Sequence, residues 1–131
     1  MVRSGNVRCS FYRYVSSRLV KKFNRMPSFD PLPLFKDAAE AAAQAQRMVE
    51  VNTSGLTYAC KEMFPCQDLL REFRRAGVRC TIGADAHQPS KVNQFIEEGY
   101  RWMYEAGYRE VSVVRPDGDI RTISSCLYFL R

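Results

Sequence analysis

Residues 66–87 read CQDLLREFRRAGVRCTIGADAH, and this stretch decides the fold class. Leu69, Leu70 and Phe73 share one face of a helix, and Gly77 supplies the left-handed residue with which many helices end. VRCTIG then has the apolar and β-branched composition of a short strand, and GADAH follows it as a loop. The stretch therefore predicts a helix, a strand and a polar loop in that order.

The sequence before this stretch follows the same order. FDPLPLFKDAAEAAAQAQ predicts a helix over residues 31–46, with Asp30 as its N-cap and Pro31 in its first turn. Residues 48–51 then predict a strand, which ends in the polar loop NTSG. A second unit of helix, strand and loop is therefore expected immediately upstream of the first.

The sequence after it predicts a third helix from Ser90 to Ala106. Its apolar stripe includes Phe95 and Trp102, which we expect to be buried against strands. REVSVV predicts a further strand, and residues 120–125 predict an edge strand or an extended tail. Helices that alternate with short strands predict an α/β fold built from βα units with parallel strands.

The net charge of +6 is confined to one end of the chain. Residues 1–25 hold seven basic residues and no acidic residue, whereas the remainder holds 13 basic and 14 acidic residues. The start has the composition of an organelle transit peptide, but it also matches a disordered basic tail. The rest of the chain is close to neutral, so its charge does not by itself indicate a nucleic-acid-binding domain.

The cysteines indicate a reducing compartment. Their number is five, no C-x-x-C pair occurs, and no signal peptide with an apolar segment precedes them. No run of 18 apolar residues is present, so no membrane span is expected. The sequence therefore predicts a cytoplasmic protein with reduced thiols.

Two loops follow predicted parallel strands, and ligands bind at the carboxyl ends of such strands. The first loop contains Asn52 and Ser54, and the second contains Asp85 and His87, the only histidine of the chain. In extended backbone, a D-x-H pair places both side chains on one face. A carboxylate and an imidazole on one face form half of a divalent-metal site, so Asp85 and His87 are the candidate ligands and catalytic residues.

Three segments together resemble a known family. VEVNTSGL, EMFPCQDLLREFRRAGVRCTIGADAH and EAGYREVSVV, in this order and spacing, resemble the C-terminal portion of histidinol-phosphatases of the PHP class. The resemblance extends from about Leu19 to Ile123. It implies part of a distorted (β/α)7 barrel with two or three divalent metal ions, which are manganese, iron or zinc. The implied substrate is a small phosphomonoester, L-histidinol phosphate.

The same resemblance implies that Asp85 and His87 are metal ligands and that the metal site is incomplete. The leading H-x-H motif of the family is absent, and Ser16 and Arg18 stand where the family has a histidine and an acidic residue before LVKKF. Glu50 either points inward or faces solvent or a basic partner, and we favour the second interpretation. Cys66 and Cys80 are expected to be buried residues and not ligands.

The loop NTSG supports two interpretations. Asn52, Thr53 and Ser54 either contact substrate or bond their own backbone as turn residues, and we favour the second interpretation. Thr57 stands where the family has an arginine that suits phosphate, and Asn93 replaces the glycine that often follows the valine after DAH. These departures change both loops of the expected site.

We therefore expect two regions: a basic leader over residues 1–18, without resemblance to the family, and the C-terminal part of a PHP-type phosphatase domain over residues 19–131. The resemblance begins in the middle of the family's domain, so a truncated chain is expected, without phosphatase activity in isolation. Open sheet edges would favour self-association. The alternative is a non-catalytic remnant whose basic leader binds RNA or another polyanion, using Phe11, Tyr12 and Tyr14.

Overall fold

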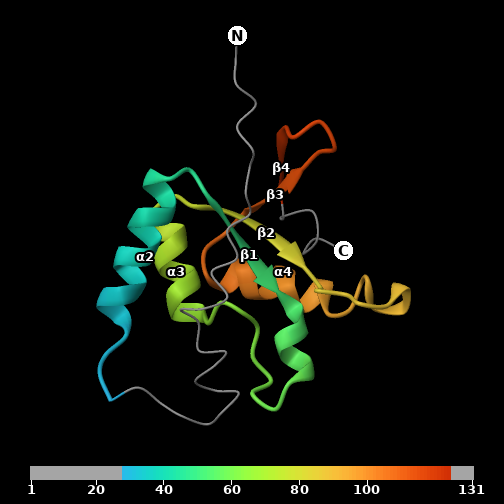
Figure 1. The fold of residues 1–131 in the computed structure, drawn as a ribbon, viewed down its shortest axis with the longest axis horizontal. Coiled ribbons are helices and arrows are strands. Elements are labelled where there is room, and N and C mark those ends of the chain that lie inside the picture. Colours follow the sequence, from blue (N-terminus) through green and yellow to red (C-terminus); the bar gives the residue numbers. More distant parts are fainter. Residues whose placement is uncertain (1–27, 125–131) are drawn as a thin grey trace.

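A computed structural model describes residues 28–124, which form a mixed α/β fold (Figure 1). The leader lies outside the described residues, with Ser16, Arg18 and the aromatic residues Phe11, Tyr12 and Tyr14. The elements, in chain order, are helix α2 (Leu32–Gln44), strand β1 (Met48–Asn52), 3₁₀ helix η1 (Thr53–Thr57), helix α3 (Gln67–Arg75), strand β2 (Arg79–Gly83), 3₁₀ helix η2 (Pro89–Lys91), helix α4 (Ile96–Glu105) and strands β3 (Glu110–Val114) and β4 (Ile120–Ser124). The predicted alternation of helices and strands is confirmed.

The first two strands form the predicted parallel pair. β1 pairs with β2 in a register that places Asn52 opposite Gly83. The loops that follow these two strands therefore leave the sheet at the same end, as the sequence predicted.

The last two strands do not continue the parallel sheet of β1 and β2. β3 pairs with β4 as an antiparallel hairpin, and within residues 28–124 it lies against β2 without a β-ladder. Of the two predictions for this segment, an edge strand or an extended tail, the structure confirms the strand, as β4. The described strands thus form two separate two-stranded sheets, and a closed barrel stays an expectation from the resemblance.

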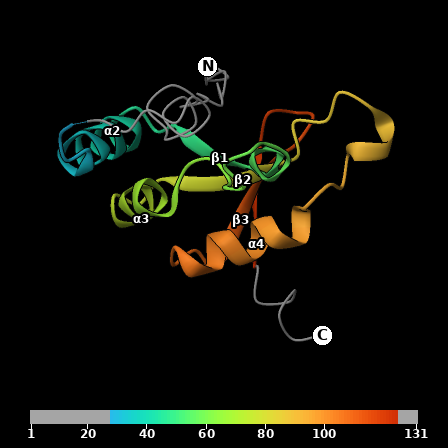
Figure 2. The same cartoon turned by 90° about the horizontal axis from the view of Figure 1, so that it is seen from below.

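The core lies between the strands and the three α-helices. α2 and α3 pack against each other beside the strands, while α4 runs along one face of them (Figure 2). The largest fully buried side chains come from α3, α4 and the strands: Phe73, Leu69, Leu70, Met103, Val51 and Val111. Their position confirms the predicted apolar face of residues 69–73. None of the helices in the described part of the chain is both long and apolar enough to cross a membrane.

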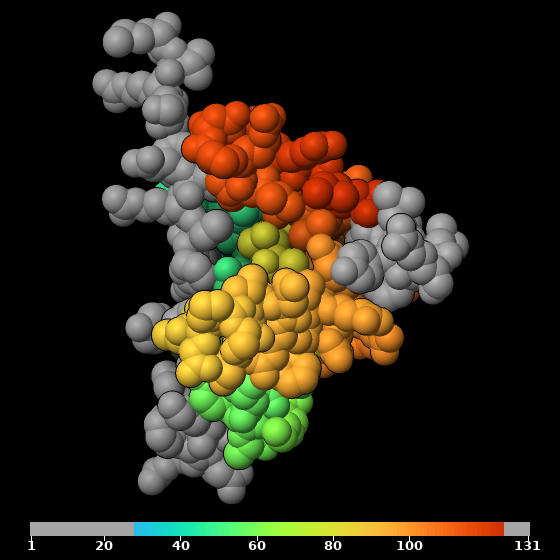
Figure 3. Space-filling model, turned by 90° about the vertical axis from the view of Figure 1, so that its right-hand side faces the viewer, coloured from blue at the N-terminus to red at the C-terminus, as the bar shows by residue number. Residues whose placement is uncertain are grey.

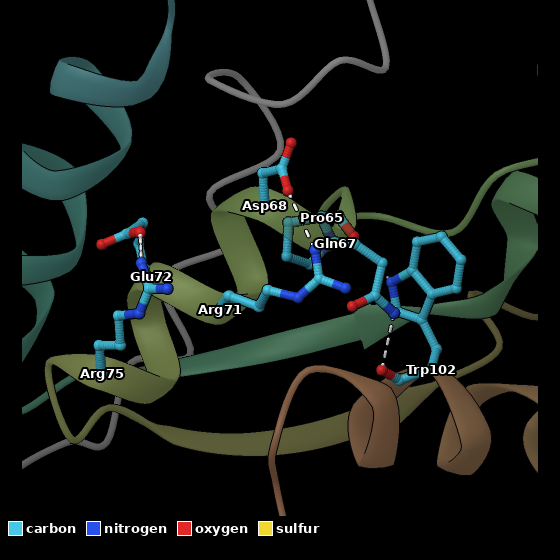
Figure 4. A network of polar contacts seen from close by, with 7 residues as sticks. All are labelled: Pro65, Gln67, Asp68, Arg71, Glu72, Arg75 and Trp102. Carbon is cyan, nitrogen blue, oxygen red and sulfur yellow. Dashed lines mark hydrogen bonds and ion pairs between the residues drawn. The ribbon is translucent and has the colours of Figure 1, made fainter.

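Trp102 joins α4 to the start of α3 through two polar contacts (Figure 4). Its Nε1 donates a hydrogen bond to the carbonyl oxygen of Pro65 at 3.1 Å, and its own carbonyl oxygen accepts one from Gln67 Nε2 at 2.9 Å. The side chain is half-buried, and so is that of Phe95. The prediction that both rings are buried against strands therefore holds only in part: Trp102 packs against the core, but both rings stay partly exposed.

The third helix begins later than its apolar stripe predicted. α4 starts at Ile96, because Phe95 has a left-handed backbone (φ 58°) that interrupts the helix. Before it, Pro89 opens the short turn η2, and Val92 is 59% exposed. The sequence predicted a helix from Ser90, but in the structure the segment before Ile96 belongs to a loop that extends from the end of β2.

The buried thiol of Cys80 and the buried hydroxyl of Tyr108 are expected to make the stability of the fold fall at alkaline pH. Burial raises the pKa of the Cys80 thiol and of the Tyr108 hydroxyl, which donates a hydrogen bond to the Val78 carbonyl oxygen at 2.9 Å. The unfolded chain releases both protons at ordinary values, so it binds fewer protons than the folded chain above about pH 9. The free energy of unfolding is expected to fall as pH rises through this range. Urea titrations at pH 8 and pH 10 measure the effect. The control is the double variant Cys80→Ala, Tyr108→Phe, whose unfolding midpoints are expected to be equal at the two pH values.

Candidate functional site

A polar hollow of about 190 Å³ lies where β1 and β2 end. One wall comes from η1 and the residues after it, and the other comes from the loop after β2. Figure 3 shows the yellow-to-orange surface of that loop lying against the green surface of η1. The lining residues are Ser54, Thr57, Tyr58, Ala84, Asp85, Ala86, His87, Gln88, Lys91 and Gln94. The structure thus brings together three of the four predicted site residues: Ser54, Asp85 and His87.

The fourth predicted residue, Asn52, supports the first wall from inside. It is 5% exposed, and its Oδ1 accepts hydrogen bonds from the backbone N–H and the hydroxyl of Ser54. Thr57 Oγ1 donates to the Ser54 carbonyl oxygen at 2.6 Å, which closes the turn. These contacts agree with the interpretation of NTSG as a loop that bonds its own backbone.

Glu50 lies beneath the same loop. Its Oε1 accepts a hydrogen bond from Asn52 Nδ2 at 3.4 Å, and its carboxylate occupies the space beside Gly83, where a Cβ atom would lie 3.0 Å from Glu50 Cδ. The side chain is half-buried. Glu50 therefore neither faces open solvent nor lines the hollow, and Gly83 leaves room for it at the end of β2.

The second wall contains the D-x-H pair, in a conformation that differs from the predicted one. β2 ends at Gly83, and Asp85 has a left-handed backbone (φ 52°), so the prediction of an extended D-x-H is wrong. Instead, His87 Nδ1 lies 2.8 Å from the Asp85 carbonyl oxygen. A carbonyl oxygen only accepts, so Nδ1 carries the proton and Nε2 of the neutral ring keeps its lone pair. His87 is exposed and Asp85 is half-buried.

The second wall is fastened to the first by a buried threonine. Thr53 Oγ1 donates a hydrogen bond to the Gln94 carbonyl oxygen at 2.6 Å. Lys91 lies between two short turns, since its N–H donates to Gln88 and its carbonyl oxygen accepts from Gln94 N, both at 3.0 Å. Sequence reasoning missed Lys91 because it assigned this segment to a helix. The only signal for Lys91 in the sequence was a single basic residue six positions after Asp85.

Two larger hollows lie away from these loops. One, of about 410 Å³, lies between α2 and α3, and another, of about 280 Å³, lies at the start of β2 and β3. Neither is lined by Asp85 or His87. The smaller hollow is the candidate site because it lies at the carboxyl ends of parallel strands and contains the D-x-H pair.

The residues of the site do not suffice to hold a metal cluster. Among residues 28–124, no group of three or more histidine, cysteine, aspartate or glutamate side chains could hold a metal ion. This range contains all 14 acidic residues and the single histidine of the chain. Asp85 and His87 are two candidate ligands, whereas a catalytic site needs at least three from the protein. Cys80 is buried inside β2, as expected, whereas Cys66, at the N-terminal end of α3, is only half-buried.

Manganese is therefore expected to bind this chain weakly. Two ligands, one on an exposed side chain, leave most coordination positions to water. Titration of the full chain with Mn²⁺, followed by isothermal calorimetry, is expected to show no saturation at micromolar concentrations, for the wild type and for His87→Ala alike. Micromolar binding that is lost in His87→Ala would contradict the two-ligand account.

The chain is similar to a curated protein over most of its length. It is 30% identical over 95 residues to a protein of Deinococcus radiodurans. That protein is named a probable histidinol-phosphatase. The alignment covers 72% of this chain but only 35% of the relative, so the chain spans about a third of the length of the relative it matches. No protein-family model matches the chain. The similarity agrees with the resemblance to PHP-type phosphatases.

Proposed function

We propose that this chain binds a phosphomonoester in the hollow at the ends of β1 and β2, as the C-terminal part of a PHP-type phosphatase fold. The observation that carries the proposal is the parallel register of β1 and β2, which brings the NTSG and GADAH loops around one hollow. The name of the Deinococcus radiodurans protein supports L-histidinol phosphate as the ester. Metal-dependent hydrolysis of this ester is the activity that the resemblance implies for a complete site.

The side chains of the hollow suit recognition of the ester more than its hydrolysis. Lys91 supplies a cation that attracts a phosphate, and His87 Nε2 and the Asp85 carboxylate supply groups that accept a proton or a ligand's hydrogen bond. The metal ions that the resemblance implies, manganese, zinc or iron, would need ligands beyond Asp85 and His87. We therefore expect binding without appreciable turnover in this chain.

Comparison of L-histidinol phosphate with L-histidinol tests the proposal. The two ligands differ only by the phosphate, so the ester is expected to bind the full chain at least about tenfold more tightly, through charge-assisted hydrogen bonds. Calorimetry measures both affinities, and a phosphate-release assay with Mn²⁺ is expected to remain at background. Equal affinities for the two ligands would refute the phosphomonoester site, whereas manganese-dependent release abolished by His87→Ala would refute the conclusion that the site is incomplete.

A further inference from the structure

The hydrogen of the Ser54 hydroxyl is already used within the loop. The backbone N–H of Ser54 donates to Asn52 Oδ1 at 3.1 Å, and a backbone N–H only donates, so this contact fixes which way the Asn52 amide points. Ser54 Oγ lies 2.5 Å from the same oxygen. It must therefore donate its single hydrogen to Asn52. Toward the hollow, Ser54 Oγ presents only lone pairs.

The hydroxyl of Thr57 is in the same state. Its Oγ1 lies 2.6 Å from the Ser54 carbonyl oxygen, which only accepts, so the hydroxyl hydrogen is used there. The hydroxyls of Ser54 and Thr57 can therefore accept a hydrogen bond from a ligand but cannot donate one. A phosphoryl oxygen, which is itself an acceptor, gains nothing from them. An ammonium group, which carries three donors, is complementary to both.

The opposite wall carries the matching donor. Lys91 is one of the residues that line the hollow, and none of the ion pairs within residues 28–124 involves its ammonium group. Its backbone is held between the turns at Gln88 and Gln94. The η1 wall therefore offers the acceptors of Ser54 and Thr57, while the wall that follows β2 carries Lys91 together with the Asp85 carboxylate and His87. A ligand that fits this arrangement carries a phosphate at one end and a hydrogen-bond donor at the other.

We propose that Ser54 and Thr57 are specificity-determining residues, which accept hydrogen bonds from the ammonium group of an aminoalkyl phosphomonoester while Lys91 contacts its phosphate. This inference rests on the proposed phosphomonoester site and adds which residues select the rest of the ligand. It also reverses the simplest expectation for Ser54, whose hydroxyl would otherwise be assigned to the phosphate.

Two simple ligands separate the contributions of the two walls. 2-Aminoethyl phosphate and ethyl phosphate share the phosphate and differ in the amine. The full chain is expected to bind the amine-bearing ester about tenfold more tightly, because an ammonium group forms charge-assisted hydrogen bonds with the acceptor wall. Calorimetry or NMR titration of the wild-type chain gives both affinities and their ratio.

Matched variants then assign the effect to residues. Thr57→Val keeps the shape of the exposed side chain but removes the acceptor, so it is expected to lower the ratio severalfold, as is Ser54→Ala. Thr57→Ser keeps the hydroxyl and is expected to keep the ratio. Lys91→Met is expected to weaken both esters about tenfold, whereas Lys36→Met, on the exposed surface of α2, is expected to change neither. Circular dichroism of each variant verifies that it is folded.

The outcomes distinguish this inference from the proposed function. A wild-type ratio near one, or a ratio that Thr57→Val leaves unchanged, overturns the acceptor wall while the phosphate site stands. Equal effects of Lys91→Met and Lys36→Met overturn the assignment of Lys91. Failure of the wild-type chain to bind either ester removes the proposed phosphomonoester site, and this inference with it.

Discussion

Gly55→Ala is expected to lower the free energy of unfolding by at least about 3 kcal/mol, near the upper end for a single substitution. Gly55 is buried in η1, and a Cβ atom there would overlap the backbone carbonyl oxygen of Glu62. A backbone carbonyl cannot move aside as a flexible side chain can. The substitution should therefore separate η1 from the segment before α3 and disturb the Ser54 and Thr57 wall.

Gly77→Ala is the matched control for this prediction. Gly77 ends α3 with a left-handed backbone (φ 77°), but nothing lies within 4 Å of the position that its Cβ would take. Its substitution costs only the strain of that backbone, about 1 kcal/mol. Urea unfolding followed by circular dichroism compares the two variants. A loss for Gly55→Ala no larger than that for Gly77→Ala would show that η1 is not packed as described.

Phe73→Ala is expected to lower the free energy of unfolding by about 3–5 kcal/mol. Phe73 is the largest fully buried side chain among the described residues, and it lies on the face of α3 that packs into the core. Removing its ring loses apolar burial and leaves a cavity that the packed neighbours fill only in part.

Phe29→Ala tests whether that loss comes from burial. Phe29 is 58% exposed, so the same chemical change is expected to alter stability by less than about 0.5 kcal/mol. Thermal unfolding measures both variants against the wild type. Similar losses in the two variants would contradict the core described for α3.

The sequence alone determined the local elements of this protein. The stretch from residue 66 to residue 87 predicted α3, the left-handed Gly77 and β2, and the structure confirms each. These features depend on helical periodicity, strand composition and the conformational freedom of glycine, all of which are local. The parallel arrangement of β1 and β2 followed because short βα units leave few alternative topologies.

The errors lie where a distant contact overrides the local pattern. The apolar stripe predicted a helix from Ser90, but Thr53, about 40 residues earlier, binds the carbonyl oxygen of Gln94 and holds the segment before Phe95 as a loop. Gly99 permits this, because helix α4 approaches Ile82 and Thr53 so closely there that a Cβ atom would overlap Ile82. Periodicity describes one helix at a time, so it cannot report such a contact.

The sequence and the tertiary structure also each determined a part of the chemistry of the site. The sequence identified Asp85 and His87 by residue type and by their place after a strand. Only the tertiary structure gave Asp85 its left-handed backbone and placed Lys91 at the hollow. It also formed the hydrogen bonds that occupy the hydroxyl hydrogens of Ser54 and Thr57. The direction of a hydrogen bond depends on the partner's position in space, and residues distant in sequence or held by a turn acquire that position only when the chain folds.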